Sequence, residues 1–209
     1  MPAVMTSRAC SVGLALLLLC PACNHGASPA VADAPVAAPS TSTVTHQAAL
    51  PAATPATVAA PLGLLPVGSD VPDITAPAQD GSHVSLRALK GKPIVVYFYP
   101  KDDTPGCTVE AKGIRDQFAE LKGLAVVLGV SADTLDSHRA FAQKYDLPFL
   151  LLDDSSHALT TAFGVPLSSG HAKRVTFIID ATGKVREVFP EVVPAEHAAG
   201  LIAALKKLG

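Results

Sequence analysis

The chain has 209 residues, which is room for one domain of ordinary size together with additional segments. Its 16 basic and 18 acidic residues nearly balance, which argues against a basic nucleic-acid-binding surface and against an acidic tail. Only Arg8 and Asp33 are charged before residue 66. The first 65 residues therefore differ in character from the rest of the chain.

Residues 1–23 have the features of an export signal. One positive charge precedes an apolar run from Ala9 to Leu19, which is shorter than the roughly 20 residues of a stable membrane span and typical of a secretory signal. Ala22 before Cys23 resembles the end of a bacterial lipoprotein signal, although Cys20 stands where Leu is usual. We expect lipidation at Cys23 and an exported, periplasmic protein. Simple cleavage and an uncleaved anchor are the alternatives.

Residues 24–65 contain 13 Ala, 6 Pro and a single charge. Prolines at this density interrupt a helix, and the segment has no aromatic residue with which to build a core. The composition predicts a disordered tether that leads to a folded domain over residues 66–209.

Within that domain, strand and helix signals alternate. Asp80-Gly81 predicts a hairpin turn, and the β-branched and aromatic run 94–99 predicts a strand buried on both faces. Apolar spacing predicts further strands and helices, in chain order helix 107–121, strand 124–130, helix 134–145, strand 149–152, helix 156–163, strands 175–179 and 185–189, and helix 194–208. Parallel crossovers, followed by one terminal hairpin with its turn at Asp180–Gly183, predict a thioredoxin-like α/β fold, with a central mixed sheet flanked by helices.

The cysteines are unevenly placed. Cys10, Cys20 and Cys23 lie in the N-terminal segment, so the domain holds Cys107 alone and cannot contain an internal disulfide. A lone cysteine is either a small buried hydrophobic residue or a reactive thiol. The seven histidines are scattered without ligand spacing, and we therefore expect neither a metal ion nor another cofactor.

Thr104-Pro105-Gly106-Cys107 follows a predicted strand and opens a predicted helix. Pro105 and Gly106 suit a tight entry that a longer side chain would crowd. A cysteine in the first helical turn faces unpaired N–H groups and the positive end of the helix dipole, which favour its thiolate. A nearby arginine would favour the thiolate further, and the hydroxyl of Thr104 can lie beside the sulfur. Such a thiolate can attack a peroxide, with fixed donors stabilising the leaving oxygen, and become a sulfenic acid.

Pro100-x-x-x-Thr104-x-x-Cys107 resembles the peroxiredoxin active-site signature in all three fixed positions, and residues 97–111 are similar to the bacterioferritin-comigratory, or Q-type, branch. Residues 173–180 are similar to the family segment whose arginine reaches the sulfur, so the resemblance spans about residues 66–209. The resemblance implies that Cys107 is the peroxidatic nucleophile and that Thr104 and Arg174 bind and polarise the peroxide. It also implies that Pro100 shields the sulfur and that Glu110 is a supporting acid.

The chain departs from the branch at one position. Many Q-type members carry a resolving cysteine five residues after the first, where this chain has Lys112. The resemblance therefore implies reduction of hydrogen peroxide and small organic hydroperoxides by a one-cysteine cycle, which an external thiol or thioredoxin-like protein completes. Cys23 could reach Cys107 only through the tether.

Two other functions compete with this interpretation. A thiol–disulfide oxidoreductase normally needs Cys-x-x-Cys, but Glu110 occupies the fourth position of that motif. A non-catalytic tethered thioredoxin-fold module would have no reason to keep Cys107, Thr104 and Arg174 together.

The loop 166–173 is shorter than is usual in the family, which would open the site. We expect a monomer or weak dimer, with membrane attachment only through the N-terminal lipid.

Overall fold

The protein is described from a computed structural model in which residues 63–208 are placed. The expected signal peptide, Cys23 and most of the expected tether lie outside the described residues. Leu64 and Leu65, at the end of the expected tether, pack against the core, and the Leu65 N–H donates to the carbonyl of Phe163 at 2.9 Å. Packing of the folded domain thus begins slightly before residue 66. None of the helices in this described part is long and apolar enough to cross a bilayer.

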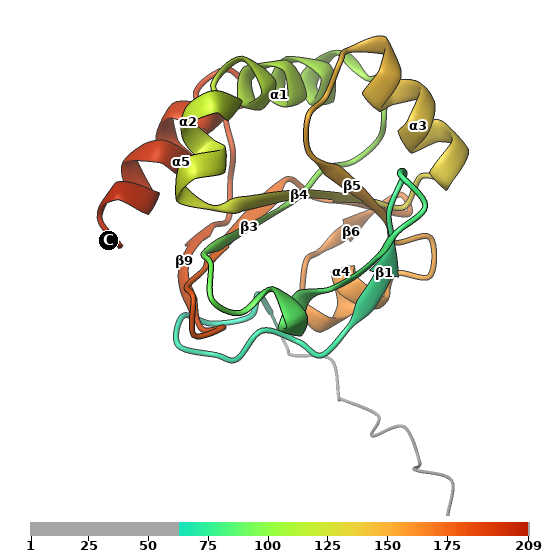
Figure 1. The fold of residues 1–209 in the computed structure, drawn as a ribbon. Helices are drawn as coiled ribbons and strands as arrows, with labels where there is room; N and C mark the ends of the chain where they lie inside the picture. Colours follow the sequence, from blue (N-terminus) through green and yellow to red (C-terminus); the bar gives the residue numbers. More distant parts are fainter. Residues whose placement is uncertain (1–62, 209) are drawn as a thin grey trace, which may run out of the picture. The chain divides into compact units, whose positions relative to one another are not determined.

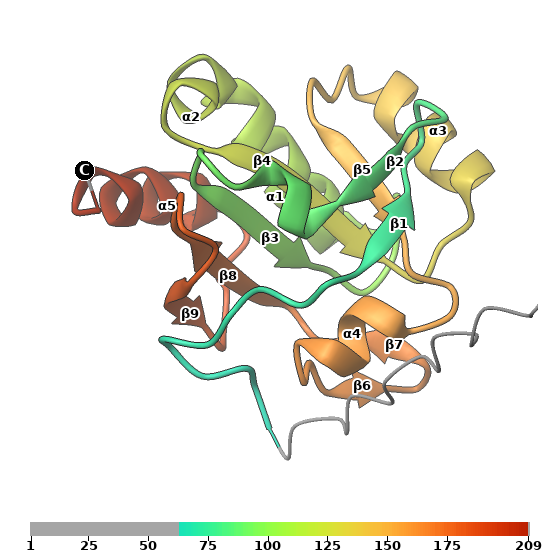
Figure 2. The same ribbon diagram turned by 60° about the horizontal axis from the view of Figure 1, so that its bottom comes forward.

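A mixed sheet of five strands, in the order β5-β4-β3-β8-β9, forms the centre of the domain (Figure 2). Strands β3, β4 and β5 are parallel, whereas β8 runs antiparallel to both β3 and β9. Their bounds are β3 Ile94–Phe98, β4 Val126–Ser131, β5 Leu150–Asp153, β8 Val175–Ile179 and β9 Val185–Phe189. This arrangement confirms the predicted thioredoxin-like α/β fold, including its terminal hairpin.

Helices and smaller elements cover the two faces of the sheet (Figure 1). One face packs against four helices, namely α1 Pro105–Asp116, α2 Phe118–Leu124, α3 Leu135–Lys144 and α5 His197–Lys206. The other face packs against β1 Thr75–Pro77, β2 His83–Ser85, the 3-10 helix η1 Leu86–Leu89 and α4 Ala158–Ala162. The predicted turn at Asp80-Gly81 joins β1 to β2.

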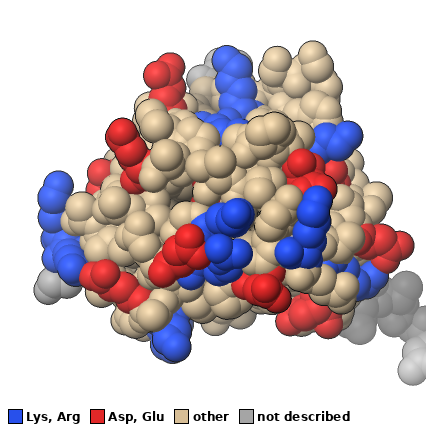
Figure 3. All heavy atoms as spheres, turned by 90° about the horizontal axis from the view of Figure 1, so that it is seen from above, with Lys and Arg blue, Asp and Glu red and all other residues tan. Residues whose placement is uncertain are grey.

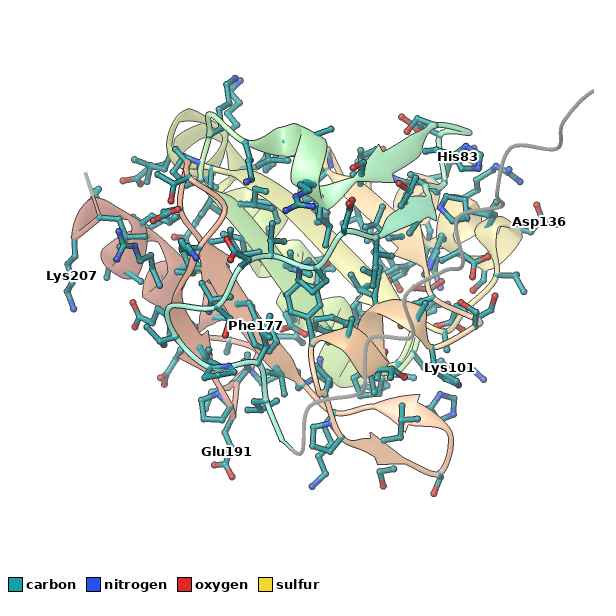
Figure 4. All side chains as sticks on the ribbon, turned by 90° about the horizontal axis from the view of Figure 1, so that it is seen from below. His83, Lys101, Asp136, Phe177, Glu191 and Lys207 are labelled. Atoms are coloured by element: carbon teal, nitrogen blue, oxygen red, sulfur yellow. The ribbon has the colours of Figure 1, made fainter. Side chains whose placement is uncertain are left out.

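The central strand β3 has the double-sided burial that its sequence predicts. All five of its residues are buried, with alternate side chains directed to the two opposite cores. On β8, Phe177 joins the core that contains β1, β2 and α4. Figure 4 shows Phe177 within the domain, whereas His83, Lys101, Asp136 and Lys207 lie at its periphery.

The single helix predicted over 107–121 is wrong in its extent, because two helices occupy this region. The junction is Gln117, with φ −104° and ψ 9°. Its N–H donates to Gly113 and its carbonyl accepts from the N–H of Leu121, so hydrogen bonding continues while the helix axis changes direction. Apolar spacing does not reveal such a change. The apolar side chain of Val109, near the start of α1, is 48% exposed.

The loop 166–173 contains a small hairpin that the sequence prediction missed. It pairs β6 Leu167–Ser168 with β7 His171–Ala172. Ser169 and Gly170 between them have φ of 51° and 79°, the left-handed backbone that a two-residue hairpin turn requires. Strands of two residues are too short to show a period in the sequence.

Candidate active site

The loop from Pro100 to Thr104 leaves the carboxyl end of β3 and is attached to α3 by Asp102. This buried carboxylate accepts hydrogen bonds from Tyr99 Oη and Ser137 Oγ, both at 2.8 Å. It also lies 2.9 Å from His138 Nδ1, while His138 Nε2 faces the carbonyl of Leu152 at 3.2 Å. The His138 ring therefore lies between the Asp102 carboxylate and the backbone of β5, and Asp102 ties the loop to α3 through two of its residues.

Asp103 makes a second attachment of the loop to α3. Its φ of 56° lies in the left-handed region, and its carboxylate accepts from Lys144 Nζ at 2.7 Å and from Tyr145 Oη at 2.6 Å. These hydrogen bonds, first that of Lys144, hold the pKa of Asp103 below its ordinary value. The loop therefore has two anchors, one buried and one exposed.

Cys107 lies in the first turn of α1 and is only 2% exposed. The first helical hydrogen bond runs from Thr108 N to Thr104 O at 2.8 Å, so the N–H groups of Gly106 and Cys107 precede the helical ladder. Thr104 occupies the N-cap position, but its side chain makes no capping hydrogen bond. Its hydroxyl donates to the carbonyl of Lys101 at 3.0 Å, which leaves the oxygen lone pairs as acceptors.

Arg174 directly precedes β8, and the antiparallel register brings it to the active-site loop. Val175 lies opposite Phe98, so residue 174 reaches the end of β3 from which the loop departs. Arg174 Nη2 donates to Cys107 Sγ at 3.4 Å, and Nη1 pairs with Glu110 Oε2. Burial by itself lowers the pKa of Arg174, but the charges of Glu110 and the Cys107 sulfur raise it above its ordinary value. The guanidinium is therefore a permanent cation beside the sulfur.

Gly106 provides the space through which the guanidinium approaches. A Cβ atom at this position would lie 3.1 Å from Arg174 Nη2, which is closer than a side-chain carbon normally comes to a neighbour. The predicted need for a small residue before Cys107 thus has a specific cause, since the crowding would come from Arg174.

Glu110 is fully buried and has a second partner that the sequence prediction missed. Its Oε1 lies 2.9 Å from His197 Nδ1, at an angle outside that of a well-formed hydrogen bond, and neither atom has another partner among residues 63–208. His197 Nε2 lies 3.0 Å from Thr176 Oγ1. No sequence signal could have singled out His197, because nothing in its spacing relates it to α1.

The structure brings most of the predicted site residues together. Cys107, Glu110 and Arg174 form one contact cluster beside Gly106. Pro100 is half-buried at the start of the loop. Lys112, where the resemblance would place a resolving cysteine, is exposed, with Nζ 6.0 Å from the centre of the Tyr145 ring.

Outside this cluster, we considered surface charge and possible metal ligands on the domain. Seen from the side of α1, basic and acidic side chains are interspersed over the surface (Figure 3). Within residues 63–208, no group of three or more His, Cys, Asp or Glu side chains is arranged to hold a metal ion.

Comparisons with known proteins identify the family of this chain. Residues 67–188 match the family model described as AhpC/TSA family. The chain is 42% identical over 147 residues to a putative peroxiredoxin bcp of Coxiella burnetii, covering 66% of this chain and 97% of that protein. It is 43% identical over 145 residues to a chloroplastic peroxiredoxin Q of Suaeda salsa, covering 68% of each.

Solved structures give the same result. Peroxidoxin BcpB from Mycobacterium tuberculosis is 33% identical, with a TM-score of 0.64 over 68% of this chain and 97% of that chain. The bacterioferritin comigratory protein of Xanthomonas campestris, whose structures concern alkyl peroxide reduction, is 34% identical, with a TM-score of 0.64 over 68% of this chain and 99% of that chain. With a family match over more than half of its length, and with near-complete coverage of the Coxiella protein and of both solved structures, the chain belongs to the AhpC/TSA family and is a peroxiredoxin, a thiol-dependent peroxidase.

Proposed function

We propose that Cys107 is the peroxide-attacking nucleophile and that Arg174 and Thr104 bind and polarise the peroxide. One observation carries the proposal, namely that a guanidinium nitrogen donates to Sγ of a cysteine in the first turn of a helix. A fixed cation and the positive end of a helix dipole both favour the thiolate, which is the reactive form.

The reaction follows from the donors and acceptors around the sulfur. The thiolate attacks one oxygen of ROOH, the O–O bond breaks, and the leaving RO⁻ takes a proton to become ROH or water. Arg174 Nη2 and the N–H of Cys107 stabilise charge that develops on the peroxide oxygens. Thr104 Oγ1 accepts the hydrogen bond of the peroxide O–H, since its own proton is given to Lys101. The product on Cys107 is a sulfenic acid.

Burial of the sulfur supports small substrates. A thiol that is 2% exposed is reached by hydrogen peroxide or a small organic hydroperoxide more readily than by a bulky one. Pro100, half-buried at the loop start, contributes to this shielding. The proposed substrate class is therefore small hydroperoxides.

A one-cysteine cycle completes each turnover. Cys107 is the only cysteine from residue 24 onward, and exposed Lys112 stands where a resolving thiol would otherwise be found. One external thiol attacks the sulfenic sulfur and releases water, leaving a mixed disulfide. A second thiol then releases the disulfide of the reductant and regenerates Cys107. A small thiol or a thioredoxin-like protein can serve as this reductant.

The two competing functions fit the geometry less well. A thiol–disulfide oxidoreductase would need a second thiol at position 110, where a fully buried carboxylate is instead paired with Arg174. A non-catalytic module has no use for a guanidinium directed at the sulfur. Peroxide consumption by wild type and by Cys107→Ser, with dithiothreitol as reductant, tests the assignment. We expect turnover to be abolished in Cys107→Ser, and equal consumption by the two proteins would overturn it.

A second experiment tests the one-cysteine cycle separately. Replacing Cys10, Cys20 and Cys23 together by Ser leaves Cys107 as the only thiol. We expect this variant to keep the wild-type turnover with an external thiol and to be labelled by dimedone, a sulfenic-acid reagent, after one equivalent of peroxide. Loss of turnover with Cys107 intact would show that an N-terminal cysteine resolves the intermediate.

We further propose that the chain is exported to the periplasm and anchored by a lipid on Cys23, with no other membrane attachment. Residues 1–23 support this through their short apolar run and the Ala22-Cys23 pair. Mass spectrometry of the mature N-terminus is the test. A mature chain that begins with diacylated Cys23 is expected, and an unmodified Cys23 would overturn the anchor. Sedimentation velocity tests the expected monomer or weak dimer.

A further inference from the structure

The two oxygens of the Glu110 carboxylate have different partners. Oε2 accepts from Arg174 Nη1, whereas Oε1 faces His197 Nδ1 at 2.9 Å. The carboxylate is fully buried, so bulk solvent does not compete with either contact. Arg174 therefore meets only one oxygen of Glu110, and its second terminal nitrogen is directed to the sulfur.

This arrangement differs from the usual pairing of an arginine with a carboxylate. Arginine and a carboxylate usually pair through two parallel hydrogen bonds, which use both terminal nitrogens of the guanidinium. If Glu110 turned to that geometry, Nη2 would move from Cys107 Sγ to Glu110 Oε1. The contact between His197 and Oε1 opposes this turn.

Contacts on several sides hold the His197 ring in place. Its Nδ1 lies 2.9 Å from Glu110 Oε1, and both atoms are buried with no further partner among residues 63–208. Thr176 Oγ1 lies 3.0 Å from Nε2 and holds the ring from its other side. The rings of Tyr97 and Phe189 pack edge-on against the imidazole, which restricts its orientation.

Other ionisable groups near His197 do not replace this contact. Burial, with smaller effects of the charges on Glu110, Asp102 and Cys107, raises the pKa of Tyr97 well above its ordinary value, so its phenol stays neutral. Glu191 and Glu196 line a surface pocket beside His197, and Figure 4 shows Glu191 at the periphery of the domain. His197 is thus the side chain that faces Oε1.

We propose that His197 is a positioning residue of the peroxidase. It holds one oxygen of Glu110, prevents two-point pairing between Glu110 and Arg174, and so keeps Arg174 Nη2 on Cys107 Sγ. This inference rests on the proposed role of Cys107 as nucleophile. It assigns no direct contact between His197 and the substrate.

The test measures thiolate formation in the absence of peroxide. Ultraviolet absorbance of the thiolate is followed against pH for wild type, His197→Phe and His197→Asn, and the matching Cys107→Ser spectrum is subtracted each time. In His197→Phe we expect half-maximal absorbance to move to higher pH by about one pH unit, with about a tenfold lower kcat/KM at pH values below both midpoints. His197→Asn keeps an N–H donor near the position of Nδ1 and is expected to recover most of both losses.

Two further variants separate positioning from stability. Thr176→Val removes only the hydroxyl that holds the ring, and a smaller shift in the same direction is expected. Ile202→Ala, a core truncation on the same helix, is expected to destabilise the fold without moving the titration. If His197→Phe leaves the titration of wild type unchanged, or if Ile202→Ala moves it equally, the inference is wrong. If His197→Phe does not fold, His197→Asn and Thr176→Val still test the inference. A titration of His197→Asn far from that of wild type, or a titration of Thr176→Val equal to that of wild type, would contradict it. Activity of Cys107→Ser, in contrast, would contradict the proposed function itself.

Discussion

Gly106 lies so close to Arg174 that an added side chain would crowd the guanidinium. An added Cβ would lie 3.1 Å from Arg174 Nη2, the nitrogen that also donates to Cys107 Sγ. Because residue 106 has no side chain, the Arg174 guanidinium can lie close to the sulfur of Cys107. This relationship ties the local sequence of the helix start to a residue that arrives from a different strand.

The first prediction concerns this contact. Gly106→Ala should displace the guanidinium by a few tenths of an ångström and lower kcat/KM for peroxide about tenfold, because catalysis depends on the position of the fixed donor. Steady-state peroxide kinetics measure the effect. Gly113→Ala on the same helix is the matched control, because its Cβ would lie 3.9 Å from the carbonyl oxygen of Pro194. That variant should keep full activity and gain about 0.5–1 kcal/mol of stability. Equal activities of the two variants would contradict the prediction.

A second prediction concerns the shape of the cation. Lysine has a single ammonium group and cannot hold Glu110 and Cys107 in the two directions that the guanidinium spans. Arg174→Lys should lower kcat/KM about 100-fold, in the range of losing one fixed transition-state donor. Arg186→Lys, at an exposed ion pair with Asp180, should leave the kinetics unchanged. A wild-type rate in Arg174→Lys would show that charge alone is sufficient.

The two anchors of the active-site loop should differ in strength. Asp102→Ala leaves the buried His138 ring and two hydroxyl groups without their acceptor, and we expect a loss of about 3–5 kcal/mol in the free energy of unfolding. Asp103→Asn affects an exposed pair that solvent screens, and Asn tolerates the left-handed backbone, so its unfolding curve should stay close to that of wild type. Urea unfolding of the three proteins measures both effects. Similar losses in the two variants would argue against the buried anchor.

Asp180, in the turn between β8 and β9, is expected to make the stability of the fold depend on pH. Burial raises the pKa of Asp180, but hydrogen bonds from Thr182, the Lys184 N–H and Arg186 outweigh it and bring the pKa below the ordinary 3.8. The ionised carboxylate therefore stabilises the fold above about pH 4, and this contribution is lost as the pH falls through the lowered value.

Asp180→Asn should accordingly cost about 1 kcal/mol near neutral pH, the size of a charge-assisted contact partly screened by solvent. The difference from wild type should shrink progressively below pH 4, as the wild-type carboxyl takes up its proton. Unfolding free energies of both proteins at a series of pH values check this, and a difference that stays constant into acid would contradict the assignment.

The sequence by itself determined the elements whose signals are local. A β-branched run made β3 a strand, Asp180–Gly183 marked the last hairpin, and Thr104-Pro105-Gly106-Cys107 placed the thiol at a helix start. Turn chemistry, helix termini and apolar alternation act over a few residues, so they can be identified without the fold. The sequence did not predict the helix junction at Gln117 or the short hairpin at 167–172, because neither feature changes the spacing of the apolar residues.

Only the tertiary structure decided which groups meet around the sulfur. The register of β8 against β3, with Val175 opposite Phe98, brings Arg174 to Cys107. Packing of α5 then places His197 against Glu110. Such contacts depend on strand pairing and on how buried charges share their partners, and residue spacing along the chain records neither. The sequence indicated the nucleophile, whereas the fold determines how its cation is held in place.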